Sequence, residues 1–300
     1  MPPLVYLLRF IYFGKFTEVE KYAKEVIDGN VYQLNSNFND NFSFDNYAGN
    51  PEFIFEIKSH PLGGYAISST VSLLAVMTGI RGDDDTGWGF DNPTQDLYDA
   101  YDDGDPRREF TIAKDGDFYD SEDILVLDPN VPAYGVDGDG YAGKKWYETK
   151  SKRSSFGDID HYMQKSFPIL RYADIILMYA EALNENGKAS EALQQLNSIR
   201  ERARNSTSPT SSIPADIAVS GQSEIRDAIL KERRLELAFE WNRYYDLVRT
   251  KRAGKVLKSF AARYNTPKGA AFDDSKHYLM PIPQVDITRT DGVIKQNPGY

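Results

Sequence analysis

The chain has 300 residues, of which 41% are hydrophobic and 27% are charged, and it contains no cysteine. This composition is typical of a globular chain, and it excludes disulfides, thiolate chemistry and cysteine-based metal sites. A net charge of −10 and an isoelectric point near 4.9 argue against a nucleic-acid-binding surface, because phosphate contacts need clustered Lys and Arg and the basic residues here are interleaved with acidic ones.

The first apolar run covers residues 4–13 and is interrupted by Arg9. It is shorter than the roughly 20 residues of a membrane-spanning helix. It also lacks the small-residue cleavage site of a signal peptide. We therefore interpret it as part of a helix in the protein body.

An internal repeat aligns Gly14–Val26 (GKFTEVEKYAKEV) with Gly187–Ile199 (GKASEALQQLNSI). Both copies fit a helix, a glycine at its C-terminal end, and a second helix with Thr17 or Ser190 as its N-cap. The repeat predicts two helical hairpins of tetratricopeptide type. Such hairpins bury their apolar faces by stacking on neighbours, so two copies predict some exposed apolar surface. The residues expected to be exposed are Leu4, Leu7, Leu8 and Ile11.

Between the hairpins, residues 31–165 lack helical periodicity and are rich in Gly, Asp, Asn and Tyr. Pro51–Lys58 alternates as a strand does, and Pro93 is expected at the first position of a short helix. The remainder is predicted to be loop, and long loops inside a compact domain are often functional. A second irregular stretch, Ser206–Gln222, is rich in Ser, Thr and Pro and is predicted to be an exposed, mobile connection.

Aromatic residues make up 13% of the chain, and many lie in the predicted loops. Sugars have flat C–H faces and many hydroxyls, so a site that binds them needs exposed rings beside hydrogen-bonding side chains. The alternative for Trp88 and Trp146 is that each anchors its loop to the core. The candidate ligand-binding residues are Tyr65, Asp84, Asp85, Trp88, Tyr141 and Trp146.

No catalytic residue, cofactor or metal site is predicted. The three histidines have no metal-binding or catalytic-triad spacing, and there is no phosphate-binding loop. Val136–Gly143 (VDGDGYAG) partly matches a calcium-binding loop, but only Asp137 and Asp139 fit, so a turn is favoured. A glycosidase would need two carboxylates across a cleft, a separation that a sequence cannot show.

Lys231–Ala253 has helical periodicity and carries an unusual charged stripe. Its carboxylates at Glu232, Glu236 and Glu240 would repel one another by a few tenths of a kcal/mol per pair if they only faced water. We therefore expect cations from a neighbouring helix among them, with Arg200 and Arg204 as candidates. The alternative is a solvated charged face. The stripe consists of Glu232, Glu236, Glu240, Arg243, Asp246 and Arg249.

The chain contains four long motifs: Trp88–Arg108, Leu170–Ala203, the segment ERRLELAFEWNRYYDLVR, and the chain end YLMPIP with QNPGY. In their order along the chain, these motifs resemble the SusD/RagB family of glycan-binding surface lipoproteins from Bacteroidetes. This chain has Trp241 where family members usually carry Gly in a Glu-Gly-x-Arg motif. It also opens inside a hairpin, whereas family members are longer and begin with a lipoprotein signal, so we expect its N-terminal part to be missing.

The resemblance implies a mainly α fold, a tetratricopeptide-like superhelix with long irregular loops and a few short strands. We expect one unit over 1–300, divided into a hairpin at 1–30, a loop-rich ligand-binding part at 31–165, and a C-terminal hairpin, charged helix and tail at 166–300. The elements before and after the loop-rich part would then form the scaffold that carries it.

The function implied by the resemblance is non-catalytic binding of oligosaccharide or polysaccharide. The implied partner is a SusC-like TonB-dependent transporter, to which glycan would be delivered at the surface of the outer membrane. Membrane association would need a lipid anchor, and this sequence has no cysteine to carry one. The alternative is a tetratricopeptide-type adaptor that binds a peptide, although a bare repeat array has no long aromatic loops.

Overall fold

The computed structural model describes residues 2–43, 49–58, 77–82, 85–86, 88–117, 127, 130, 139–147 and 166–300, and in residues 2–5, 82, 85 and 86 it describes the backbone alone. It divides into two compact units, Met1–Glu240 and Trp241–Tyr300. The expected Tyr65, Asp84 and Asp137 lie outside the described residues. The two units are treated separately below.

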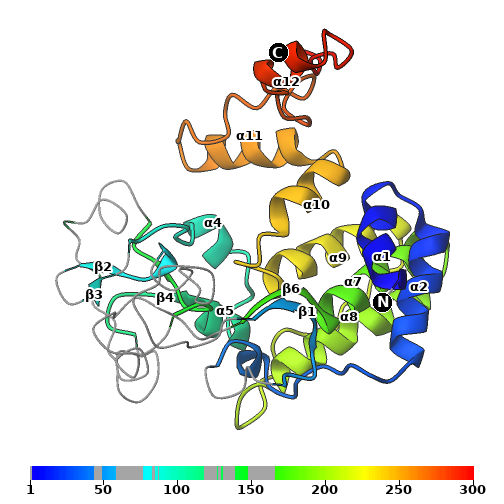
Figure 1. Cartoon of the computed structure of the whole chain (residues 1–300). Coiled ribbons are helices and arrows are strands. Elements are labelled where there is room, and N and C mark those ends of the chain that lie inside the picture. The colour runs from blue at the N-terminus through cyan, green and yellow to red at the C-terminus, as the bar shows by residue number, and fades with distance from the viewer. Residues whose placement is uncertain are drawn as a thin grey trace. The chain divides into compact units, whose positions relative to one another are not determined.

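Helices form the scaffold of the first unit (Figure 1). The central helix, α7, packs against α2, α8 and α9, and α1 packs against α2. Nearly every side chain of α7 is buried, which explains its almost continuous apolar sequence. The mainly α, tetratricopeptide-like fold expected from the sequence is confirmed. The bounds are α1 Pro2–Tyr12, α2 Phe16–Asp28, α7 Tyr172–Glu185, α8 Ala189–Arg204 and α9 Gln222–Glu236.

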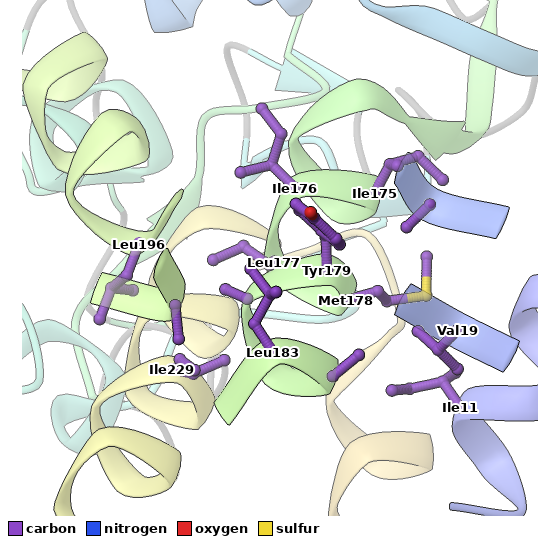
Figure 2. Close-up of a cluster of buried hydrophobic side chains, with 14 of the residues drawn as sticks. Ile11, Val19, Ile175, Ile176, Leu177, Met178, Tyr179, Leu183, Leu196 and Ile229 are labelled. Carbon is purple, nitrogen blue, oxygen red and sulfur yellow. The ribbon is translucent and has the colours of Figure 1, made fainter. Parts of the chain in front are cut away.

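The core of this unit joins both predicted hairpins (Figure 2). Ile11 and Val19 of the first hairpin lie against the α7 side of the cluster, which also holds Leu196 of α8 and Ile229 of α9. Leu7 and Ile11 are buried, so the expectation that they would be exposed is wrong. The physical reason is that α7 supplies the neighbouring face that the first hairpin needs. Leu8 is exposed, as expected, while the side chain of Leu4 is not described.

Each hairpin turns at the predicted glycine but starts its second helix earlier than expected. Gly14 and Gly187 have φ of +64° and +80°, the left-handed conformation that favours glycine. The residues that precede α2 and α8 are Lys15 and Lys188, so the N-caps predicted at Thr17 and Ser190 are wrong. Both predicted caps lie in the first turn of their helices.

Short strands and helices organise the described part of residues 31–147. β1 (Phe53–Ile57) pairs antiparallel with β6 (Phe167–Arg171), which confirms the predicted strand. The helix expected to start at Pro93 starts instead at Gln95, because Thr94 accepts a hydrogen bond from Leu97 N and caps it. The other elements are η1 Phe38–Asn41, β2 Arg81–Gly82 paired with β3 Asp85–Thr86, α4 Gln95–Tyr98, α5 Pro106–Thr111, and β4 Ile112–Ala113 paired with β5 Ala142–Gly143.

The Ser/Thr/Pro-rich connection between α8 and α9 is packed against the scaffold. Ser206 is buried, and its Oγ accepts a hydrogen bond from Phe38 N at 2.8 Å. Ile217 packs on the core, and its N–H donates to Asn197 Oδ1 at 2.8 Å. Most of the connection is exposed, as predicted, but the prediction of exposure is wrong at Ser206 and Pro214, which are buried, because local polar composition does not show which side chains find partners.

The long charged helix expected over Lys231–Ala253 is broken. α9 ends at Glu236, and α10 (Arg243–Arg249) begins after an irregular turn. Within that turn Phe239 and Trp241 have φ of +61° and +57°. A left-handed conformation costs a residue other than glycine about 1–2 kcal/mol, so Trp241 carries strain at the position where the SusD/RagB pattern has Gly.

The second unit contains α10, α11 (Ala253–Arg263) and α12 (Gln284–Arg289). One face of α11 packs on the following chain, where Gly254 leaves room for the Asp274 carboxylate. Lys258 Nζ also lies 3.2 Å from Asp274 Oδ2, and Tyr278 OH donates to Asp274 Oδ1 at 3.1 Å. These contacts fix α11 on the C-terminal segment of its own unit.

Candidate functional site

The three glutamates of the charged stripe lie inside the first unit. Glu232, Glu236 and Glu240 are all buried, and they bond to cations, so the paired interpretation is confirmed. The cluster balances five carboxylates with five cations, as buried charges require. The carboxylates are Glu52, Asp105, Glu232, Glu236 and Glu240, and the cations are Arg107, Lys145, Arg171, Arg200 and Arg202.

The cations come mainly from residues that sequence reasoning did not assign. Arg200 pairs with Glu232 at 2.6 Å, not with Glu236 or Glu240. The expectation for Arg204 is wrong, since its Nη1 lies 2.9 Å from Asp216 Oδ1 on the connection. Arg171 instead reaches Glu240, with Nε 2.7 Å from Oε2.

Glu236 and Lys145 show how strongly the cluster acts on its members. Burial alone would raise the pKa of Glu236, but Arg202, Arg171 and Arg107 hold that pKa well below its usual range. Burial lowers the pKa of Lys145 to about 8 against the attraction of Glu240. Since every carboxylate of the cluster is buried and paired, we regard the cluster as a structural frame for the loops it contacts.

Two of the expected ligand-binding aromatics, Trp146 and Tyr141, are buried in apolar clusters. Trp146 is 2% exposed and packs with Phe38 and Phe42, while its Nε1 donates to Phe239 O at 2.8 Å. The anchoring alternative therefore describes Trp146 in this structure. A ring covered on its faces offers nothing for a sugar to stack on, so we leave Trp146 out of the proposed site.

Tyr141 is also covered. It is 6% exposed, and its ring stacks on Tyr98 with 5.0 Å between the centroids. Its hydroxyl donates to Gln95 Oε1 at 2.8 Å. The same loop provides Asp139, whose Oδ2 accepts from Gln95 N at 2.8 Å. Of the two acids in the calcium-like pattern, the described one thus stabilises the start of α4, and the described residues hold no group of three acids or histidines suited to a metal ion.

Trp88 differs from Trp146 in being exposed. Its side chain is 46% exposed and lies beside Phe90, which is 53% exposed. The ring centroids are 5.9 Å apart and the ring planes are inclined by 67°. Asp85 lies nearby in sequence within β3, where only its backbone is described. The exposed Trp88–Phe90 pair is our candidate functional site.

The backbone beneath this pair is held by short hydrogen bonds. Gly89 N donates to Gly79 O at 2.9 Å, and Phe90 N donates to Met77 O at 2.8 Å. Asn92 Nδ2 donates to Gly89 O at 2.7 Å. The neighbouring Ile80 is buried in a small apolar cluster. The backbone that carries the two exposed rings is therefore fixed by hydrogen bonds, which reduces the conformational entropy lost when a ligand binds.

Comparison with known proteins identifies the family. The model described as the SusD family matches residues 32–300. The chain belongs to the SusD family. Among SusD family relatives, SusD-like protein P2 of Formosa agariphila is 31% identical in an alignment 317 positions long, gaps included. The alignment covers 99% of this chain and 57% of that protein.

Solved structures of SusD-like proteins have the same fold. Surface glycan-binding protein A from Bacteroides thetaiotaomicron superimposes with a TM-score of 0.77 at 23% identity, over 99% of this chain and 63% of that one. A laminarin-binding SusD-like protein gives a TM-score of 0.75 at 26% identity, over 99% and 62%. This chain thus spans less than two thirds of the length of these SusD family proteins.

Phe90 is a site residue that sequence reasoning on this SusD family member missed. The available signal was a second aromatic residue two positions after Trp88, although Gly89 between them has φ of +66°, so the segment is not a regular strand. Among the described residues, no helix is long and apolar enough to cross a membrane.

Proposed function

We propose that this protein binds oligosaccharide or polysaccharide at the Trp88–Phe90 pair. The observation that carries the proposal is an exposed, backbone-tied aromatic pair in a chain of the SusD family. Exposed rings are what the C–H faces of sugars stack on, and Asp85 and Tyr65 remain proposed neighbours that would supply hydrogen bonds. Asp84 belongs to the same proposed set.

The inclination of the two rings suggests the shape of the ligand. Planes inclined by 67° do not both lie flat against successive sugars of a straight, ribbon-like chain. A chain that turns between residues meets Trp88 with one sugar and Phe90 with the next. Two stacked sugars correspond to a modest affinity, with dissociation constants of about a millimolar to a micromolar.

We propose that the bound glycan leaves chemically unchanged. The densest group of carboxylates in the described part of the chain is buried and fully paired with cations, so it cannot serve as a general acid or nucleophile at a surface glycan. The exposed pair itself has no group that transfers a proton. Capture and release is the function that this chemistry supports.

By its family, we further propose that the protein acts at the cell surface and passes glycan to a SusC-like TonB-dependent transporter. The anchor to the outer membrane would be a lipid, as in lipoproteins. Weak capture suits such a step, because the ligand must be released, and docking beside a transporter raises the effective concentration of the ligand there.

The test is titration of the chain with a panel of soluble glycans, followed by Trp88→Ala, Phe90→Ala and the control Phe13→Ala. Phe13 is 64% exposed at the end of the first helix, so its substitution removes a comparable ring elsewhere. We expect each site variant to weaken binding at least tenfold and the control to bind normally. Absence of binding to every glycan, with retention of a peptide partner in a pull-down, would favour the adaptor alternative.

A further inference from the structure

Charge is distributed very unevenly between the two units. Residues 241–300 contain 11 Lys and Arg against five Asp, whereas the whole chain contains 35 basic and 45 acidic residues. The second unit is therefore positive by six charges in a chain of net charge −10. Charge asymmetry of this kind indicates a partner of opposite sign.

The basic residues gather on the solvent side of α11. Lys255 and Lys258 are exposed, and a step of three residues places their amines on one side of the helix. Exposed Lys251 lies in the turn two residues before the helix starts. Arg252 and Arg263 flank the same side, and α11 contains no acidic residue. We call this set, Lys251, Arg252, Lys255, Lys258 and Arg263, the α11 basic face.

The opposite side of α11 is already used within the unit. Ala253, Gly254 and Ala261 are buried, and Leu257 lies against Gly269. The helix therefore cannot turn its apolar side outward without losing this packing. What it offers to a partner is its cationic side alone.

Weak local pairing leaves the lysines available. Lys258 pairs with Asp274 at 3.2 Å, but both side chains are about half exposed, and exposed pairs contribute little. Lys251 Nζ lies 4.5 Å from the Tyr278 ring centroid, and a ring does not neutralise a charge. Like charges at this spacing repel each other unless an anion lies against them.

We propose that the α11 basic face docks on an anionic lipid surface, with its amines against the headgroup phosphates. Clusters of four to eight Lys and Arg on an amphipathic helix are suited to anionic headgroups. Between its cations α11 itself carries only Ser259 and Ala262, and the Tyr278 ring next to this face lies against Lys251. Lysine is a flexible point charge, which suits a diffuse anionic surface better than a directional site.

Salt limits the distance over which charges of the chain act on a membrane at this face. At physiological ionic strength the Debye length is about 8 Å, so charges farther away than this are largely screened. A membrane that approaches the α11 basic face is attracted mainly by the cations next to it. Binding should consequently fall as salt is added.

The test is co-sedimentation of the full chain with vesicles of phosphatidylglycerol and phosphatidylcholine, or of phosphatidylcholine alone, at low and high salt. We expect binding only to the anionic vesicles, and weaker binding at high salt than at low salt. The triple variant with Lys251→Gln, Lys255→Gln and Lys258→Gln should weaken binding about 100-fold, because each basic residue near the surface raises the affinity about fivefold.

The control variant combines Lys15→Gln, Lys21→Gln and Lys58→Gln, which are exposed lysines of the first unit. It changes the net charge by the same amount and should bind anionic vesicles normally. Equal weakening by both triple variants would overturn the proposal, because net charge alone would then explain binding. Failure of the full chain to bind anionic vesicles would also overturn the proposal. The same holds if the α11 triple variant binds soluble polygalacturonate less well but binds vesicles normally. Thermal unfolding of both variants checks that they fold, and the glycan titrations are a separate readout.

Discussion

Lys145 and Glu240 form a buried ion pair, with Lys145 Nζ 2.6 Å from Glu240 Oε1. The same amine donates to the backbone oxygens of Glu236 and Ala238, at 2.9 and 2.7 Å. The last carbonyl groups of a helix have no partner within it, and here Lys145 satisfies them at the end of α9. One side chain from the loop-rich part thus stabilises the turn in which the charged helix breaks.

Replacing Lys145 with Met should therefore destabilise the protein by about 3–5 kcal/mol, the typical effect of removing one partner from a buried pair. Glu240 would keep Arg171 but lose its second cation. Ala238 O would lose its bond from Lys145, and Glu236 O would keep only the longer bond from Arg171 Nη2 at 3.3 Å. The measurement is urea unfolding followed by circular dichroism. Lys21→Met, at an exposed position, is the control and should change stability by less than about 0.5 kcal/mol. Equal stability of the two variants would contradict the structural role of Lys145.

Acid should destabilise the protein through Glu236 and Glu240. Burial alone would raise the pKa values of these two carboxyl groups, but the nearby arginines and Lys145 hold both pKa values below the ordinary value of 4.5. The unfolded chain therefore binds protons more readily in this range than the folded chain. Their contribution to stability is complete above about pH 4.5 and is lost as the pH falls below it. Urea midpoints measured from pH 7 to pH 3 should fall, and Glu240→Gln should flatten that dependence. A parallel decline in the variant would show that other groups are responsible.

The two tryptophans of the first unit should separate binding from stability. Trp146→Phe removes the bond from Nε1 to Phe239 O and should cost about 1 kcal/mol of stability while glycan affinity stays normal. Trp88→Ala should lower glycan affinity while the free energy of unfolding stays normal, because Trp88 is 46% exposed. Calorimetric titration and urea unfolding of both variants provide the comparison. A loss of affinity in Trp146→Phe without loss of stability would return Trp146 to the binding site.

Trp241→Gly should raise the free energy of unfolding by about 1 kcal/mol. At φ of +57° a glycine avoids the strain that tryptophan carries, and the ring is 42% exposed, so less packing is lost than at a buried site. Trp241→Ala is the matched control, since it removes the ring and keeps the strained Cβ. Stabilisation by Ala as large as that by Gly would assign the effect to the ring and not to the backbone.

Sequence reasoning predicted the hairpins because their signals are local. The glycines at Gly14 and Gly187, the helical periodicity after each of them, and the strand at Pro51–Lys58 all act over a few residues. Helix boundaries were less certain, and the predicted caps Thr17 and Ser190 lie two residues after the observed N-caps, Lys15 and Lys188. Capping depends on which side chain meets the first free N–H groups, and several neighbouring residues can do this.

The candidate site was only partly predictable for the same reason. Composition identified the loop aromatics, but it could not separate exposed Trp88 from buried Trp146, because exposure depends on which distant residues cover a ring. Phe42 and Phe167, which pack on Trp146, are more than 20 residues away from it on either side. Phe90 was missed since it looks like a core residue until its surroundings are known.

The sequence by itself determined the fold class, the family, the two hairpins and the fact that three carboxylates at helical spacing need cations. Only the tertiary structure decided which cations these are. Arg107 and Arg171 are 125 and 69 residues from the carboxylates they meet, Glu232 and Glu240. Periodicity reports contacts within one helix, whereas a buried charge selects its partners through space, from whatever chain the packing brings beside it.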